Sequence, residues 1–200
     1  MRKFLLIAGI FIAVVIIAAL VVRRPPQNPD PNHTHADFAV WIDGEKFDFS
    51  GDEFMSGSSK EEVGEDHGHE HKHPNLHLHD NVGNVIHRHK PGLSLGEFFA
   101  SIGIKMEQTC FSTDIDRAVC NTEGKTWQMF RNGKEVPFDP SYVFADEDHL
   151  LLTYGATHEQ LISELQQMTD DSCIYSQTCP ERGEKPEEGC VADPAVPCTE

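Results

Sequence analysis

The chain has 200 residues and carries 33 acidic against 16 basic side chains, which gives a formal net charge of −17 at pH 7. This excess of negative charge argues against binding to nucleic acid or to an anionic lipid surface, because both partners attract basic proteins. Beyond an apolar N-terminal segment, the remaining residues suffice for one domain with a hydrophobic core and flanking tails.

An uninterrupted apolar run over residues 4–22 opens the chain between two pairs of basic residues. It is about as long as a transmembrane helix and longer than the apolar region of about 7–15 residues in a secretory signal peptide. We therefore expect residues 1–24 to be an uncleaved membrane anchor, followed by a Pro-rich stalk over residues 25–32. The six cysteines form no Cys-x-x-Cys pair and suit an oxidising compartment. We expect a single-pass protein of the cell membrane, with its N-terminus inside and the bulk of the chain extracytoplasmic.

A β-rich domain is predicted over residues 33–155, and it begins with a hairpin that turns at Asp43-Gly44. Apolar and polar residues alternate along the first arm, so the two sets lie on opposite faces of the strand. The polar face carries His33, His35 and Asp37. This arm therefore presents one His-x-His pair at the start of the domain.

The next segment, residues 50–73, is polar and of low complexity, which is typical of a mobile, solvated insertion. It ends in a tract in which histidine alternates with other, partly acidic residues. Such a tract binds metal ions loosely in any conformation and could collect ions for a more ordered site. Its candidate auxiliary ligands are His67, His69, His71 and His73.

A second hairpin is predicted over residues 74–89, with one His-x-His pair on each arm. Each pair shares a strand face, but the two pairs meet only in one register, because a shift by one residue sends them to opposite faces. We favour a three-residue loop, 81–83, in which Gly83 adopts the left-handed conformation. This loop sets the first histidine of one pair opposite the first of the other and puts all four on one face. The four are His77, His79, His87 and His89.

Three His-x-His pairs between residues 33 and 89 are more than composition alone explains, and they predict a transition-metal site. Imidazole ligands suit Zn²⁺, Cu²⁺ and Ni²⁺, whereas Cu⁺ would recruit Met or Cys, and we expect Zn or Cu. The predicted ligands are His33, His35, His77, His79, His87 and His89.

A short helix is predicted over residues 92–102, with Ser94 and Glu97 as a capping box and Gly103 at its end. Its apolar positions have helical spacing and belong to the core. Cys110 and Cys120 then bracket a turn-rich excursion, for which a disulfide between them is the simplest account.

Two strands, 125–130 and 134–136, are predicted to pair through an Asn-Gly turn, and a buried strand follows at 149–155. A helix capped by Thr157 is predicted within residues 156–172. Its expected apolar face consists of Leu161, Ile162, Leu165 and Met168. The Cys-rich tail, 173–200, is expected to hold disulfides whose pairing stays open among Cys173, Cys179, Cys190 and Cys198.

The order of these elements resembles the β-grasp fold. The resemblance covers roughly residues 37–154 and rests on two stretches, Trp127 to Gly133 and Asp146 to Tyr154. It implies an α+β fold built on a β-grasp-like mixed sheet with one packed helix. The His-rich hairpin would be an elaboration of this fold, and the C-terminal helix and disulfide-rich tail would follow it.

The chain as a whole resembles a group of membrane-anchored, histidine-rich exported proteins of candidate-phylum bacteria and some archaea. The matching stretches are His33-Thr-His-Ala-Asp-Phe, His77-Leu-His-Asp, Gly83-Asn-Val-Ile-His-Arg-His and Cys179-Pro-Glu-Arg-Gly. Some members are labelled disulfide isomerases. Because this chain lacks a Cys-x-x-Cys pair, we do not carry that activity over, and no catalytic residue follows from either resemblance.

The sequence therefore predicts an extracytoplasmic metal-binding protein. One alternative is a metal-dependent enzyme of unknown substrate, in which Asp37 or Asp80 would act as the base. The other is an interaction or adhesion module that presents a surface to an unknown protein partner, with histidines that respond to pH. His149 and His158 are isolated in the sequence and are interpreted as surface or capping residues.

Overall fold

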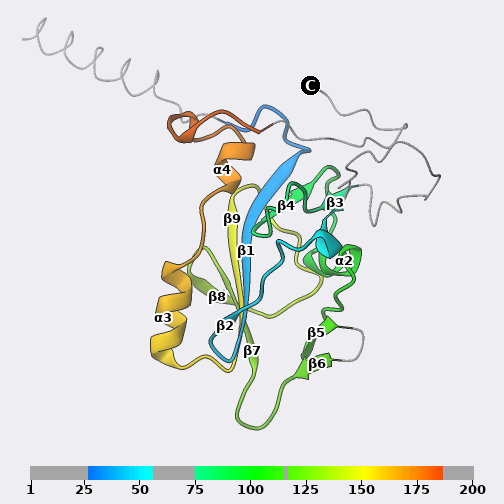
Figure 1. Cartoon of the computed structure of the whole chain (residues 1–200), viewed down its shortest axis with the longest axis vertical. Helices are drawn as coiled ribbons and strands as arrows, with labels where there is room; N and C mark the ends of the chain where they lie inside the picture. The colour runs from blue at the N-terminus through cyan, green and yellow to red at the C-terminus, as the bar shows by residue number, and fades with distance from the viewer. Residues whose placement is uncertain (1–26, 56–74, 115–116, 187–200) are drawn as a thin grey trace, which may run out of the picture.

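The computed structural model describes residues 27–55, 75–114 and 117–186 (Figure 1). Within these residues the protein is a mixed α+β fold, with one large mixed sheet, a separate two-stranded hairpin and a few short helices. The predicted fold class is confirmed at this level. None of the helices in these three ranges is long and apolar enough to cross a membrane, and the predicted anchor, residues 1–24, lies outside them.

The large sheet has the strand order β3-β4-β1-β9-β7-β8, and β2 pairs with β1. Its two central strands, β1 and β9, are parallel, and every other neighbouring pair is antiparallel. The strands are β1 (Thr34–Ile42), β2 (Glu45–Lys46), β3 (Leu76–His77), β4 (Val85–Arg88), β7 (Trp127–Arg131), β8 (Lys134–Val136) and β9 (Asp148–Tyr154). The central position of β1 brings the beginning of the domain between the His-rich hairpin and the last strand.

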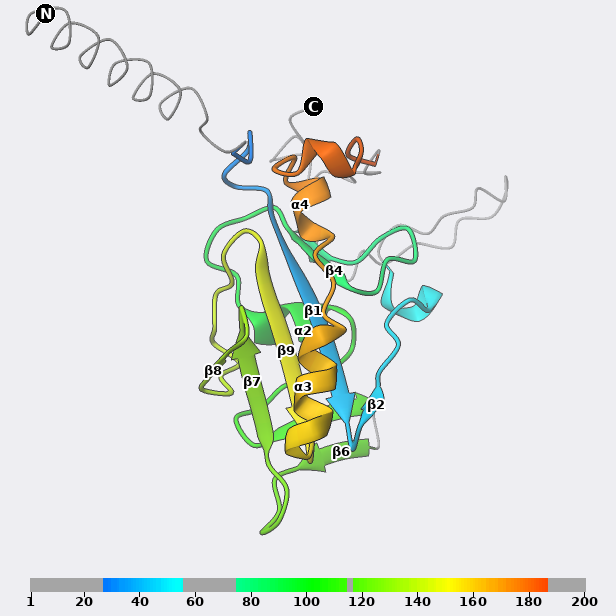
Figure 2. The same ribbon diagram turned by 90° about the vertical axis from the view of Figure 1, so that its left-hand side faces the viewer.

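Within residues 27–55, 75–114 and 117–186, three α-helices accompany the sheet, and the views in Figures 1 and 2 place α2 on one face and α3 with α4 on the other. They are α2 (Leu95–Ser101), α3 (His158–Gln166) and α4 (Ser172–Tyr175). Single turns of 3-10 helix occupy Asp52–Phe54 and Pro180–Arg182, and the separate hairpin pairs β5 (Cys110–Asp114) with β6 (Arg117–Cys120).

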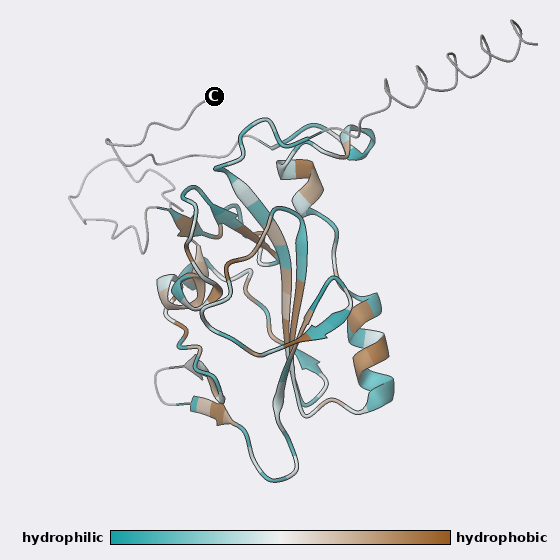
Figure 3. Ribbon diagram, turned by 180° about the vertical axis from the view of Figure 1, so that it is seen from behind, coloured by the Kyte–Doolittle hydropathy of each residue, from teal (hydrophilic) through white to brown (hydrophobic). Residues whose placement is uncertain are grey.

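Alternation along β1 divides the interior into two cores. Phe38 and Val40 belong to the larger core, which α2 covers, whereas Ala39 and Trp41 belong to a smaller core beneath α3. Figure 3 shows the apolar residues of the central strands and of α3 in brown. The face that carries Ala39 and Trp41 also carries His35 and Asp37 further up the strand, because residues two apart share a face. The polar end of that face, with His35 and Asp37, is covered by α4 and not by α3.

The turns predicted at Asp43-Gly44 and at Asn132-Gly133 and the predicted helix caps are confirmed. Asp43 and Gly44 both have positive φ angles, 54° and 84°, as the type I′ turn of the first hairpin requires. Asn132 and Gly133 do the same at 51° and 74° between β7 and β8. The capping box of α2 is present, and its chain reverses at Gly103.

The helix α3 also has its predicted capping box, but one member of its predicted apolar face is wrong. Ile162 is 45% exposed, whereas Glu164 is 1% exposed. The buried stripe runs through Leu161, Glu164, Leu165 and Met168, which are spaced as one face of a helix. Ile162 follows Leu161 by one residue, about 100° further around the helix, and therefore points away from this buried stripe. Its apolar character alone led to its wrong assignment to the buried face.

Two disulfides lie in the described part of the chain. The predicted Cys110–Cys120 bridge is confirmed and joins the first residue of β5 to the last of β6. In the tail, Cys173 pairs with Cys179 and closes a loop around the end of α4. Cys190 and Cys198 lie outside the described residues, as do the histidines of the 67–73 tract.

The His-rich hairpin has the predicted register but not the predicted loop. His77 lies opposite His87, as expected. Gly83 has no positive φ; the left-handed residues are Asp80 and Asn81, each at 57°. Gly83 is instead a site of close approach, because a Cβ there would lie 2.5 Å from the backbone of Phe49. The hairpin loop therefore packs against Phe49 and Ser50, in the segment that follows β2. The pairing of β3 with β4 comprises two residue pairs.

Candidate metal centre

Strand pairing gathers the three His-x-His pairs on one face of the sheet. His87 of β4 lies opposite His77 of β3 on one side and opposite His35 of β1 on the other. His33, His79 and His89 lie just beyond the ends of these strands, and ring contacts with His35, His87 and His77 place them beside the other three. Six imidazoles that are far apart in the sequence thus form one patch, which we call the histidine cluster: His33, His35, His77, His79, His87 and His89.

The six rings contact one another in a closed circuit. Neighbouring ring centroids are separated by 4.0 to 5.7 Å, in the order His35, His33, His89, His77, His79, His87 and back to His35. The inner three, His35, His79 and His87, are 1%, 6% and 0% exposed. The outer three are half-buried. The cluster therefore has a buried floor and a rim that reaches the surface.

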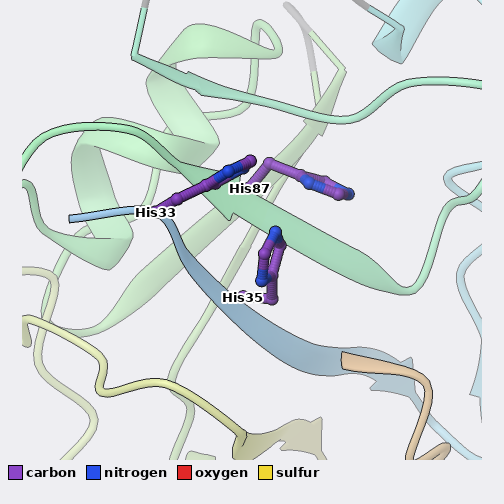
Figure 4. Close-up of side chains that lie close together, drawn as sticks. All are labelled: His33, His35 and His87. Carbon is purple, nitrogen blue, oxygen red and sulfur yellow. The ribbon is translucent and has the colours of Figure 1, made fainter. Parts of the chain in front are cut away.

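Three members, His33, His35 and His87, offer nitrogens that all lie within 4.8 Å of one another. Figure 4 shows their side chains converging from β4 and from the beginning of β1. Two nitrogens bound to one tetrahedral Zn²⁺ at 2.0–2.1 Å are about 3.3 Å apart. To bind one ion, each pair of these nitrogens would therefore have to approach by about 1.5 Å or less. Side-chain rotation supplies shifts of this size. These three residues, called the triad below, fit a transition-metal ion and leave a further coordination position open.

A chain of hydrogen bonds fixes the tautomer of His35. The Ser176 hydroxyl lies 2.7 Å from a carboxylate oxygen of Asp146 and donates its only proton to it. It must therefore accept the hydrogen bond from Nδ1–H of His35, at 2.8 Å. This tautomer leaves Nε2 as the nitrogen with the lone pair. Metal-binding histidines are characteristically oriented by such a partner on the other ring nitrogen.

A second chain orients His87 through its neighbour. Nδ1 of His79 lies 2.7 Å from the Asp80 carboxylate, which can only accept, so His79 donates and keeps its lone pair on Nε2. That nitrogen lies 3.3 Å from Nδ1 of His87. If His87 donates here, its own Nε2 carries the lone pair. Burial, and then the neighbouring histidines, lower the pKa of His87 well below its ordinary value of 6.5, so this ring is neutral and able to coordinate at neutral pH.

The helix α4 covers the floor of the cluster. The ring of Tyr175 contacts His87, His35 and His79, with centroids 4.8, 5.6 and 6.0 Å apart. The next residue is Ser176, which orients His35 as described above. The tail of the chain thus excludes water from the inner imidazoles and takes part in orienting one of them.

Sequence reasoning missed these covering residues. Tyr175, Ser176 and Asp146 come from the tail and from an acidic turn, and no local pattern links them to the histidines. It also missed a second group, in which Asp37, His149 and Asp170 offer ligand atoms within 4.8 Å of one another. No local pattern in the sequence marks His149, because the parallel pairing of β1 with β9 that places it beside Asp37 joins segments over a hundred residues apart.

That second group is better explained as a structural contact. The buried Asp37 carboxylate already accepts hydrogen bonds from the Thr169 hydroxyl and from the backbone N–H groups of Asp171 and Ser172. His149 lies 3.2 Å from the exposed carboxylate of Asp170. The group therefore ties the segment before α4 to the sheet. His158, the other isolated histidine, is exposed at the first turn of α3.

The predicted site residues thus have different outcomes. All six predicted ligand histidines lie together, and three of them form a convergent set. The auxiliary tract, His67 to His73, lies outside the described residues. Comparison of the chain with protein-family models, with curated proteins and with solved structures gives no match.

Proposed function

We propose that this protein binds a divalent transition metal at the histidine cluster. The observation that supports the proposal best is the convergence of His33, His35 and His87, since one nitrogen of each lies within 4.8 Å of the other two. The hydrogen-bond chains behind His35 and His79 add to it, because they fix tautomers that present Nε2. A patch of surface histidines would need neither burial nor orienting carboxylates.

We infer Zn²⁺ or Cu²⁺ as the ion. Neutral imidazole is a ligand of intermediate softness that suits both, and a triad of imidazoles with an open position is a geometry that Zn²⁺ accepts. Cu⁺ prefers sulfur ligands, and in the described part of the chain the cysteines of the covering segment, Cys173 and Cys179, are bonded to each other.

The two carboxylates considered as catalytic bases favour a binding role over an enzymatic one. Asp80 is hydrogen-bonded to His79, and the buried Asp37 holds the start of α4 through three hydrogen bonds. Each carboxylate is therefore committed to orienting or supporting its neighbours. A general base would need to face a substrate or a bound water.

The proposal extends to location and fold. The apolar run at residues 4–22 supports a membrane anchor, and two disulfides support an extracytoplasmic domain. The strand order β2-β1-β9-β7-β8, with β1 and β9 parallel, supports a β-grasp-like domain to which β3 and β4 are added. The role would be to bind metal at the outer face of a membrane.

The test uses the full chain, purified without an affinity tag in mild detergent with its disulfides intact. Zn²⁺ and Cu²⁺ affinities are measured for the wild type, for H35A/H87A and for H158A. We expect H158A to match the wild type and H35A/H87A to bind more than about 100-fold more weakly, beyond the effect of losing an outer-shell partner. Equal affinity in all three proteins would refute the proposed site. Far-UV circular dichroism shows whether each variant has folded.

A further inference from the structure

His77 and His89 form a second convergent pair within the cluster, outside the triad. Their Nε2 atoms lie 3.3 Å apart, and their ring centroids 4.8 Å apart. This separation is at the long end for a hydrogen bond. It equals the distance of about 3.3 Å between two ligand nitrogens on a tetrahedral Zn²⁺. In the metal-free protein one ring can donate to the other across this distance, as in the pair His79 and His87. Metal binding therefore leaves the separation unchanged, but the donating ring must carry its proton on Nδ1 and both rings must turn their Nε2 lone pairs towards the ion.

We propose that His77 and His89 hold a second metal ion at the rim of the cluster, bound more weakly than the ion of the triad; this inference rests on the proposed function. Six imidazoles are more than one tetrahedral ion can use, since its coordination is complete with four ligands. The triad takes His33, His35 and His87, and His79 orients His87. His77 and His89 are the two that remain.

The two metal positions, the triad and the pair of His77 and His89, differ in burial and therefore in expected metal affinity. His35 and His87, at the floor, are at most 1% exposed, whereas His77 and His89 are half-buried. An ion at the rim has two protein ligands and completes its coordination with water. It therefore exchanges with solution more readily than an ion that is held by three imidazoles under α4.

The two positions are connected through His33. Its ring lies 4.0 Å from that of His89 and 4.4 Å from that of His35, measured between centroids. An ion bound at the rim thus lies next to a ligand of the inner position. The carboxylates of Asp80 and Asp146, joined to the cluster through His79 and through Ser176, offset part of the charge of two cations.

The experiment counts bound ions. The background protein is the full chain with H67A/H69A/H71A/H73A, so that the auxiliary histidines predicted from the sequence do not contribute. It is titrated with Zn²⁺ in a calorimeter. We expect two binding events whose affinities differ by more than about tenfold, or 1.4 kcal/mol. In this background H77A/H89A should lose the weaker event and keep the tighter affinity, while H158A, the matched control, should keep both.

The outcomes separate this inference from the proposed function. A single event in the background protein, or two events in H77A/H89A, would overturn the rim site and leave the triad standing. Absence of any event in the background protein would overturn the proposed function itself. Because the rim residues are half-buried, H77A/H89A should fold, and its thermal unfolding without metal provides the check.

Discussion

The carboxylate of Asp37 accepts a hydrogen bond of 2.9 Å from the backbone N–H of Ser172, a residue 135 positions further along the chain. Asp37 is on β1, two residues after His35, and Ser172 is the first residue of α4. The same carboxylate also accepts bonds from Thr169 and Asp171. This one side chain therefore fixes the place where the tail begins to cover the histidine cluster.

The first prediction concerns this contact. D37A leaves three donors next to the sheet without their acceptor, and we expect it to lower the free energy of unfolding by about 3 kcal/mol. Metal affinity should fall as well, because α4 loses its anchor above His35 and His87. Urea unfolding and a Zn²⁺ titration measure the two effects. E45A, an exposed change on β2, serves as the control, and an affinity of D37A equal to that of E45A would contradict the covering role of α4.

The second prediction concerns the orientation of His79. D80A removes the acceptor of its Nδ1–H. Asp80 acts on the triad only through His79, the partner of the ligand His87, so we expect a fall in affinity of up to about 10-fold, the lower end of the effect of removing a direct partner of a ligand. Stability should change little, because the Asp80 side chain is 59% exposed. The measurement is a Zn²⁺ competition titration with E123A, an exposed acidic residue elsewhere, as the control. Unchanged affinity in D80A would show that the ring of His79 is held by other contacts.

The local part of this architecture could be predicted from sequence. The two-residue period of a strand, together with the length of the turn, predicted that His77 lies opposite His87, and the structure has this register. The register holds although Gly83 does not have the positive φ that was expected of it. The capping boxes at Ser94 and Thr157 depend on residues three apart, so they are visible in a linear pattern. In each case the determining residues are neighbours in the chain.

The completed site could not be predicted because its contacts are long-range. Nothing near His35 shows that it meets Ser176, which is 141 residues away, or that Tyr175 covers His87. The parallel pairing of β1 with β9 likewise joins segments over a hundred residues apart and brings His149 to Asp37. Such contacts are set by the packing of the whole sheet, in which residue type at one position carries little information about the partner.

The third prediction concerns the tail disulfide. C173S/C179S removes a bridge that closes a short loop at α4, and restricting so short a loop is worth about 2 kcal/mol. We expect the loss to appear mainly as faster amide exchange in α4 and weaker Zn²⁺ binding, since Tyr175 and Ser176 lie inside this loop. The matched control is C110S/C120S, whose bridge closes the separate β5–β6 hairpin. If both variants weakened metal binding equally, the effect would reflect global stability alone.

The last prediction concerns Glu164, the carboxylate that α3 buries against the smaller core. Burial raises its pKa above the ordinary value of 4.5, and the neighbouring Thr153 hydroxyl only partly offsets this. The folded protein thus disfavours the charged form, so this group lowers stability as pH rises from 4.5 towards the raised pKa and is harmless below 4.5. We expect E164Q to be more stable than the wild type at pH 7, by about 1–3 kcal/mol. The difference should disappear as the pH falls below 4.5, because both proteins then bury a neutral side chain.

Urea unfolding at pH 4 and pH 7 measures the free energy of unfolding of E164Q and of the wild type. E159Q, an exposed change on the same helix, is the control. If E164Q were more stable than the wild type by the same amount at both pH values, the charge buried at Glu164 would be ruled out as the cause.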